Sequence, residues 1–118
     1  MAYSDLLVWQ RAMDLVVEIY GLCQSFPAAE RYGLISQMQR AAISIPSNIA
    51  EGQARKSDGA FLNHLSIAAG SLAELETQFI LSERLGFCSK PTCLLVLSKT
   101  DEIGRMLTGL RSSLATNN

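Results

Sequence analysis

Residues 34–52 carry two stripes of different chemistry at the spacing of one α-helix. The apolar stripe recurs every three or four residues, as on the buried face of an amphipathic helix; it consists of Leu34, Met38, Ala42, Ile45 and Ile49. The polar stripe lies about a third of a turn away and consists of Gln37, Arg40, Ser44, Asn48 and Glu51. Pro46 lies between the two stripes. An interior proline removes a backbone hydrogen bond, so we expect a kink there.

Three further segments show a helical period, and short connections separate all four. The helix over residues 6–24, capped by Ser4 or Asp5, should bury Trp9, Ala12/Met13, Val16, Ile19/Tyr20 and Cys23. The helix over residues 59–85, capped by Ser57 or Asp58 and ended by Gly86, should bury Phe61, Leu65, Ala68, Leu72, Leu75 and Phe79. The helix opened by residues 89–91 should run to about residue 115 and bury Leu94, Leu97, Ile103, Met106/Leu107, Leu110 and Leu114, with residues 116–118 frayed. The chain is therefore predicted to be a single domain over residues 1–118, an all-α, antiparallel up-down-up-down four-helix bundle.

The central segment also contains a recognisable motif. Residues 37–52 read QMQRAAISIPSNIAEG, which resembles the four-helix-bundle family named after proteins encoded in intervening sequences of bacterial large-subunit ribosomal RNA genes. The resemblance covers about three quarters of the chain, including Trp9 before the motif and Phe61 after it. It implies a small antiparallel bundle that assembles into a ring-like homopentamer, without an established enzymatic activity. Relatives that serve as accessory proteins of diversity-generating retroelements bind nucleic acid and a reverse transcriptase.

The composition supports self-association. Only 18% of the 118 residues are charged and 48% are hydrophobic, whereas an average protein has about 25% charged residues. Too few charges are present to cover every outer face of a monomeric bundle, so we expect other subunits to cover some of them. Extra apolar positions on the first and last helices indicate self-association or, as the alternative, a docking face for another protein partner: Leu7, Leu15, Leu22, Leu95 and Val96.

A second polar stripe follows the third helix and consists of His64, Ser71, Glu74, Gln78 and Ser82. We hypothesise a hydrogen-bonded network at a helix–helix or subunit boundary, formed by Arg40, Ser44, Asn48, Glu51, Ser71 and Glu74. An Arg40–Glu74 pair would fix the register of that boundary. The alternative is an ordinary solvated face.

The sequence offers little for catalysis. His64 is the only histidine, so neither a nucleophile–base pair nor the Glu-x-x-His motif of di-metal bundles can be assembled readily. Glycines occur singly rather than in a phosphate-binding loop, and Gly70 is predicted to permit a close helix approach. We therefore expect no enzymatic activity, no metal and no cofactor.

The alternative function is nucleic-acid binding. Ten basic residues are balanced by eleven acidic ones, giving a net charge of −1, whereas nucleic-acid modules are typically basic. A ring of subunits could nevertheless repeat a basic patch made of Arg55, Lys56, Arg84 and Lys90. Otherwise these residues simply solubilise turns and helix ends. The sequence shows no signal peptide and no membrane span, and its odd number of cysteines fits reduced thiols, so a cytoplasmic location is expected.

Overall fold

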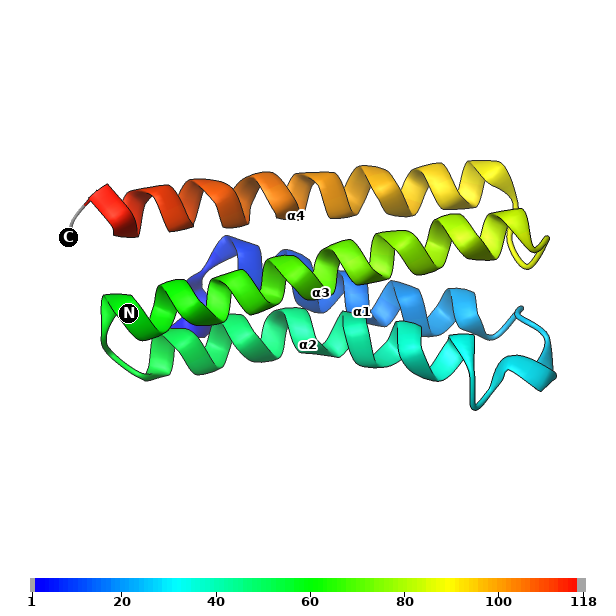
Figure 1. The fold of residues 1–118 in the computed structure, drawn as a ribbon, viewed down its shortest axis with the longest axis horizontal. Helices are drawn as coiled ribbons and strands as arrows, with labels where there is room; N and C mark the ends of the chain where they lie inside the picture. The colour runs from blue at the N-terminus through cyan, green and yellow to red at the C-terminus, as the bar shows by residue number, and fades with distance from the viewer. Residues whose placement is uncertain (1, 117–118) are drawn as a thin grey trace.

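The computed structural model describes residues 2–116 and contains four long helices. They are α1 (Leu7–Cys23), α2 (Leu34–Ala54), α3 (Asp58–Arg84) and α4 (Lys90–Thr116). Short 3-10 turns precede α1 and α2, η1 (Tyr3–Asp5) and η2 (Ala28–Glu30). Consecutive helices run in opposite directions (Figure 1), and the described part of the chain has no strand. The predicted all-α antiparallel four-helix bundle is confirmed.

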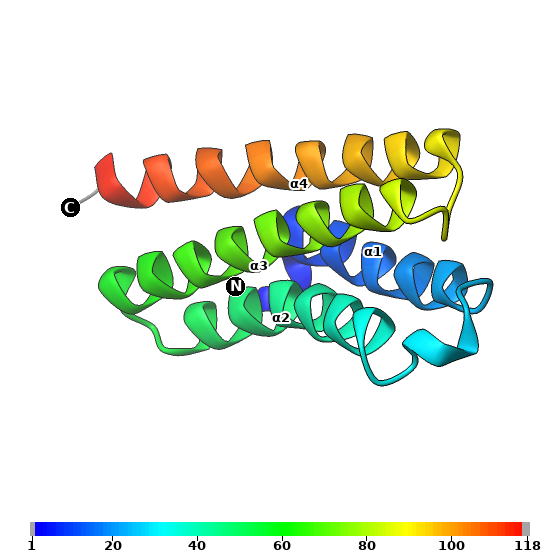
Figure 2. The same ribbon diagram turned by 45° about the vertical axis from the view of Figure 1, so that its right-hand side comes forward.

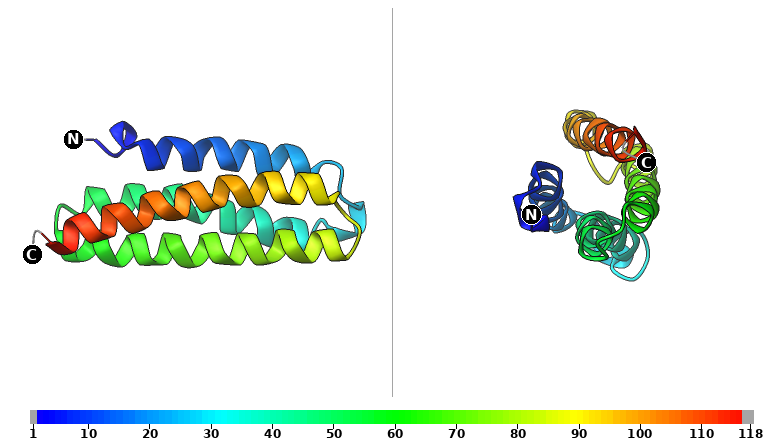
Figure 3. Two further views of the ribbon diagram at one scale, coloured as in Figure 1. Left: turned by 90° about the horizontal axis from the view of Figure 1, so that it is seen from above. Right: turned by 90° about the vertical axis from the view of Figure 1, so that its left-hand side faces the viewer.

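The helices surround one core in chain order. Figures 1 and 2 show α3 lying between α2 and α4, and the end-on view in Figure 3 places α1 opposite α3. Two ion pairs join α1 to α4: Arg11 Nε lies 3.0 Å from Glu102 Oε1, and Lys99 pairs with Glu18. No helix in the described range is both long and apolar enough to span a membrane.

The core faces of α2 and α3 are those predicted. On α2, the buried side chains include Met38, Ala42, Ile45 and Ile49, with Leu34 half-buried at the start. On α3, they include Leu65, Ala68, Leu72, Leu75 and Phe79. Trp9 and Phe61 are half-buried and pack against this core from its edge. The α2 helix is continuous through Pro46, which is buried inside it.

The predicted core faces of α1 and α4 were wrong in part. The buried positions on α1 are Val8, Ala12, Leu15, Ile19 and Cys23, whereas Met13 and Tyr20 are exposed. On α4, Val96 is fully buried and Leu94 is 56% exposed. Leu15 and Val96, expected on an outer arc, therefore belong to the core. Both helices contain runs of adjacent apolar residues, so the period alone does not choose one face.

Both ends of α3 follow local capping rules, whereas α1 and α2 begin without a side-chain cap. Ser57 accepts a hydrogen bond from the Ala60 N–H at 3.1 Å and caps α3 as predicted. Gly86 ends α3 with a φ of +79°, the left-handed conformation that glycine adopts readily. The Ser4 or Asp5 cap was wrong, because both residues lie in η1 and Leu6 occupies the N-cap position of α1. Thr116 is still helical, and the predicted fraying of residues 117 and 118 lies outside the described residues.

Candidate functional site on the face between α2 and α3

Four side chains of the two polar stripes meet between α2 and α3. Asn48 Nδ2 donates to the Ser44 carbonyl oxygen at 2.8 Å and lies 3.0 Å from Ser44 Oγ. Ser71 Oγ on α3 donates to Ser44 Oγ at 2.8 Å. His64 Nδ1 lies 3.0 Å from Asn48 Oδ1. All four residues are half-buried, so the stripes form a connected contact between helices rather than a fully solvated face.

The bonds of Asn48 determine the tautomer of His64. The amide nitrogen of Asn48 is directed at two oxygen atoms of Ser44, which leaves Asn48 Oδ1 facing the imidazole as an acceptor. Nδ1 of His64 must therefore carry a proton, and in the neutral ring the lone pair lies on Nε2. The sequence pattern placed His64 on the α3 stripe but did not identify it as the partner of Asn48.

The close approach of the helices here depends on Gly52. A Cβ atom added to Gly52 would lie 2.6 Å from His64 Cβ and 3.2 Å from Phe61 Cδ1, so only glycine fits without a shift of one helix. Gly70 was predicted to permit such an approach. Within the subunit that prediction was wrong, because Gly70 is exposed and no heavy atom lies within 4 Å of its added Cβ.

The other predicted network residues lie further out on this face. Glu51 Oε1 pairs with Arg55 Nη2 along α2 at 3.0 Å. Glu74 accepts a long hydrogen bond, 3.4 Å, from Gln78 Nε2. Arg40 is exposed and forms no ion pair with Glu74 among the described residues, so the bidentate pair does not close within one subunit. Its formation across a subunit boundary stays a prediction.

Arg40 and Glu74 nevertheless face the same surface groove. The groove has a volume of about 540 Å³, and its walls are Leu34, Gln37 and Arg40 of α2 and Glu74, Gln78 and Leu81 of α3. Gln78 is only 6% exposed, and its Oε1 atom has no hydrogen-bond partner in the described structure. Buried carbonyl oxygens are rarely left without a donor. The groove therefore carries a cation and an anion on its walls, and an unmet acceptor is buried beside it.

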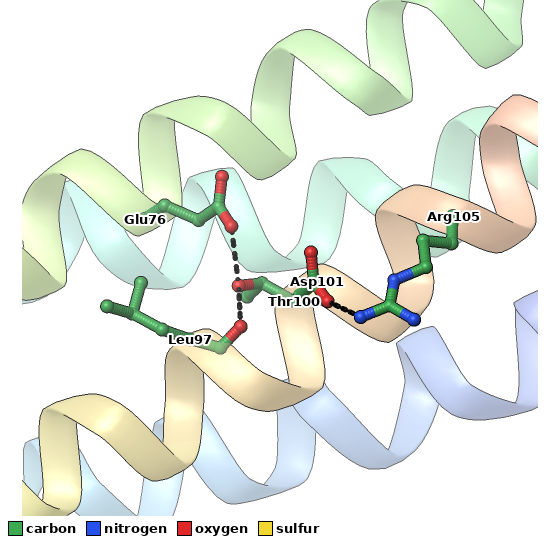
Figure 4. Close-up of polar contacts among 5 residues, drawn as sticks. All are labelled: Glu76, Leu97, Thr100, Asp101 and Arg105. Carbon is green, nitrogen blue, oxygen red and sulfur yellow. Dashed lines mark hydrogen bonds and ion pairs between the residues drawn. The ribbon is translucent and has the colours of Figure 1, made fainter.

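A second polar contact links α3 to α4 beside a surface groove of about 620 Å³. Thr100 is fully buried, and its Oγ1 lies 2.7 Å from Glu76 Oε2 and 3.0 Å from the Leu97 carbonyl oxygen. Asp101, the next residue, pairs with Arg105 along α4 (Figure 4). Thr100 therefore holds the two helices together, while Asp101 and Arg105 are exposed.

The basic residues considered for nucleic-acid contact are not brought together. Arg55 and Lys56 lie in the turn between α2 and α3, whereas Arg84 and Lys90 lie next to the turn between α3 and α4. The 27 residues of α3 separate the two turns, a distance of about 40 Å at 1.5 Å per residue. One subunit therefore offers two small basic patches, one of them partly neutralised by Glu51.

The thiols and acids do not form a reactive cluster. Burial raises the pKa of the Cys23 thiol, and it is the main cause of the raised pKa values of Cys88 and Cys93. A raised pKa lowers the thiolate fraction and with it the nucleophilicity of the sulfur. Over residues 2–116, no group of three or more His, Cys, Asp or Glu side chains is placed to hold a metal ion.

These features define an all-α bundle protein with a polar, hydrogen-bonded face between its second and third helices. The chain belongs to the family of 23S rRNA-intervening sequence proteins, whose model matches residues 4–109. The fold is similar to the crystal structure of a protein of unknown function from the S23 ribosomal protein family of Bacteroides thetaiotaomicron. That structure is 21% identical, covers 90% of this chain and 96% of its own, and superposes with a TM-score of 0.83. The comparison with curated proteins gives no match.

Proposed function

We propose that this protein is a non-catalytic scaffold that acts as a homo-oligomer, with the five-subunit ring implied by its family resemblance as the assembled form. The observation that carries the proposal is a group of exposed aliphatic side chains at the end of α3 and the start of α4. Their exposed fractions run from 42% to 56%, for Ile80, Leu81, Leu85, Leu94 and Leu95. Single exposed leucines are common, but this many exposed aliphatic side chains near one turn favour protein contacts on the adjoining surfaces.

Two further observations support a binding role. The face between α1 and α2 has an apolar groove of about 350 Å³, lined by residues that include Trp9, Met13, Ile43 and Pro46. The only histidine of the sequence is held by Asn48, which favours a structural rather than a catalytic role for this side chain. The three free cysteines support a reducing cytoplasmic location as part of the same proposal.

Light scattering on the full chain tests the proposal. We expect a mass several times 12.9 kDa at micromolar concentration, and a smaller mass when Leu85 and Leu95 are both replaced by Lys. Tyr32→Lys is the matched control, because Tyr32 is 89% exposed in the connection between α1 and α2. A monomer at all concentrations would rule out the scaffold assembly.

The alternative function, nucleic-acid binding, requires assembly to gather its charges. A ring would repeat Arg55 and Lys56 in every subunit, which would supply the cluster of phosphate contacts that one subunit lacks. Labelled RNA and DNA, each titrated at two salt concentrations, separate the two functions. Salt-sensitive binding that disappears in an Arg55→Ala, Lys56→Ala variant favours the alternative, and no binding at low salt excludes it.

A further inference from the structure

The groove between α2 and α3 is chemically incomplete in one subunit. Gln78 is 6% exposed and its Oε1 atom lacks a donor, although its Nε2 atom contacts Glu74 at 3.4 Å. Arg40, on the opposite wall, has no ion pair within the described residues. The groove is suited to a partner that supplies a hydrogen-bond donor for Gln78, an anion for Arg40 and a cation for Glu74. The partner should present these three groups in that order along its length.

The outer surface of α4 carries that order of groups. Four exposed residues lie at i, i+4, i+7 and i+11 on one side of the helix: Leu94, Ser98, Asp101 and Arg105. Asp101 and Arg105 already pair with each other, but their side chains are 57% and 80% exposed. Exposed pairs of this kind contribute little to stability, so both charges are free to exchange partners. Figure 4 shows both side chains on α4 beside the buried Thr100.

The spacing of this α4 stripe matches the spacing of the groove. Leu94 and Asp101 are seven residues apart, as are Leu81 and Glu74 on α3, and each interval is about 10.5 Å along a helix. On α2, the six residues from Leu34 to Arg40 span about 9 Å. A second α4 lying parallel to α2 in the groove would therefore place its Leu94 between Leu34 and Leu81.

The polar groups then meet in register. Ser98 of the second copy lies level with Gln78 and can donate its hydroxyl proton to Oε1 once the Gln78 side chain turns toward the groove, because Oε1 is buried in the free subunit. One turn further, Asp101 lies level with Arg40 and Glu74 and can pair with Arg40. Arg105 lies one turn beyond Asp101, and its long side chain can extend back to Glu74. Gly70 lies one turn beyond Glu74 on α3, exposed and with open space over its Cα, which leaves room for the incoming helix.

We propose that the α2–α3 groove of one subunit is completed by the α4 stripe of a second copy of this chain, with Ser98 bonding Gln78 and Asp101 pairing with Arg40. The inference rests on the proposed homo-oligomer and names the residues of one subunit contact. The groove and the stripe are different surfaces of the same subunit. The contact is therefore head-to-tail, and its repetition closes a ring if the rotation allows.

A charge exchange tests the central pair. Arg40→Glu and Asp101→Arg should each raise the dissociation constant of the oligomer by about tenfold or more, measured by analytical ultracentrifugation of the full chain. The double variant R40E/D101R should bring it back to within about threefold of wild type, since the pair is restored in reverse. Asp14→Lys is the control, because Asp14 is an exposed charge on α1, outside both proposed surfaces, and its reversal should leave the constant unchanged. Circular dichroism verifies that every variant folds.

The results separate this contact from the proposed function. An oligomer that both single variants leave intact, or that the double variant fails to restore, overturns the α4 contact but leaves the homo-oligomer standing. A wild-type monomer overturns both.

Cysteine cross-linking tests the register directly, in a Cys88→Ser background. The pair Gln37→Cys and Ser98→Cys should produce a ladder of dimers, trimers and larger species on mild oxidation, while each single variant stays uncross-linked. Dimers formed by Gln37→Cys alone would show that two grooves face each other, and that outcome also overturns the proposal.

Discussion

His64 Nδ1 lies 3.0 Å from Asn48 Oδ1, and this hydrogen bond joins the middle of α3 to the motif-bearing helix α2. Asn48 can hold the ring in one tautomer because its own amide group is fixed by Ser44. The pair is half-buried and lies beside Gly52, whose missing side chain lets the two helices approach. Three residues of different chemistry thus produce one close helix contact.

Replacing either member of this pair should destabilise the bundle. We expect Asn48→Ala and His64→Ala each to lower the free energy of unfolding by about 1–2 kcal/mol, because each leaves a half-buried polar partner unsatisfied. In the double variant the cost should be smaller than the sum of the two by at least about 0.5 kcal/mol. Urea unfolding measures all three. Asn63→Ala, an exposed position on the same helix, is the control, and strictly additive costs would contradict the coupling.

Gly52 and Gly70 should respond in opposite directions to the same substitution. Gly52→Ala forces its Cβ against His64 Cβ, so we expect a loss of about 1–3 kcal/mol as the helices separate. Gly70→Ala meets open space and should stabilise an isolated subunit by up to about 1 kcal/mol through helix propensity. Thermal unfolding of both variants, at a concentration where the protein is dissociated, makes the comparison. Equal effects of the same sign would refute this account of the close approach.

The sequence predicted α2 best because its pattern leaves one choice of face. Its apolar stripe keeps a strict helical spacing and a polar stripe runs beside it, so Met38, Ile45 and Ile49 could only point inward. On α1, adjacent apolar residues such as Leu15 and Val16 allow several faces, and the packing of α2 and α4 decides between them. The same ambiguity placed Leu94 rather than Val96 in the predicted core of α4.

The candidate site was harder to predict than the fold. Ser44, Asn48 and Ser71 were recognised from their stripes, but which side chain bonds which depends on how closely two helices approach. The close approach occurs at Gly52. A glycine has no side chain, so the sequence pattern does not show that another helix packs against it. Arg40 and Glu74 were expected to pair, and the structure instead places them on opposite walls of a groove, where long side chains can be satisfied by a second molecule.

The Thr100–Glu76 bond should be needed to hold α4 against α3. Thr100→Val keeps the shape but removes the hydroxyl that contacts the Glu76 carboxylate at 2.7 Å, and we expect a loss of about 1–3 kcal/mol. Thr100→Ser keeps the hydroxyl and should recover part of the loss. Thr108→Val is the control, because Thr108 is exposed on the same helix. It should change the free energy of unfolding by less than about 0.5 kcal/mol. A Thr100→Val variant as stable as wild type would show that the bond contributes nothing.

The three thiols should react slowly and in a fixed order. Burial is the main cause that raises the pKa of each, and the nearby Cys93 thiol and Glu83 carboxylate raise that of Cys88 further. Because a raised pKa leaves less thiolate at a given pH, the rate of thiol–disulfide exchange should reach half its maximum at a higher pH than for an unfolded-chain cysteine. Cys88 is half-buried, whereas Cys23 and Cys93 are buried, so Cys88 should be labelled first and the others only on unfolding.

Stopped-flow labelling with an aromatic disulfide across a pH series measures this order. Cys88→Ser should remove the phase seen in the folded protein, and Glu83→Gln should shift the midpoint of that phase to lower pH by removing a negative charge near the sulfur. The slow phases of Cys23 and Cys93 then report the opening of the core, because neither sulfur is accessible while α1 and α4 remain packed. Labelling of Cys23 in the folded protein at the rate of Cys88 would show that the end of α1 opens independently of the bundle.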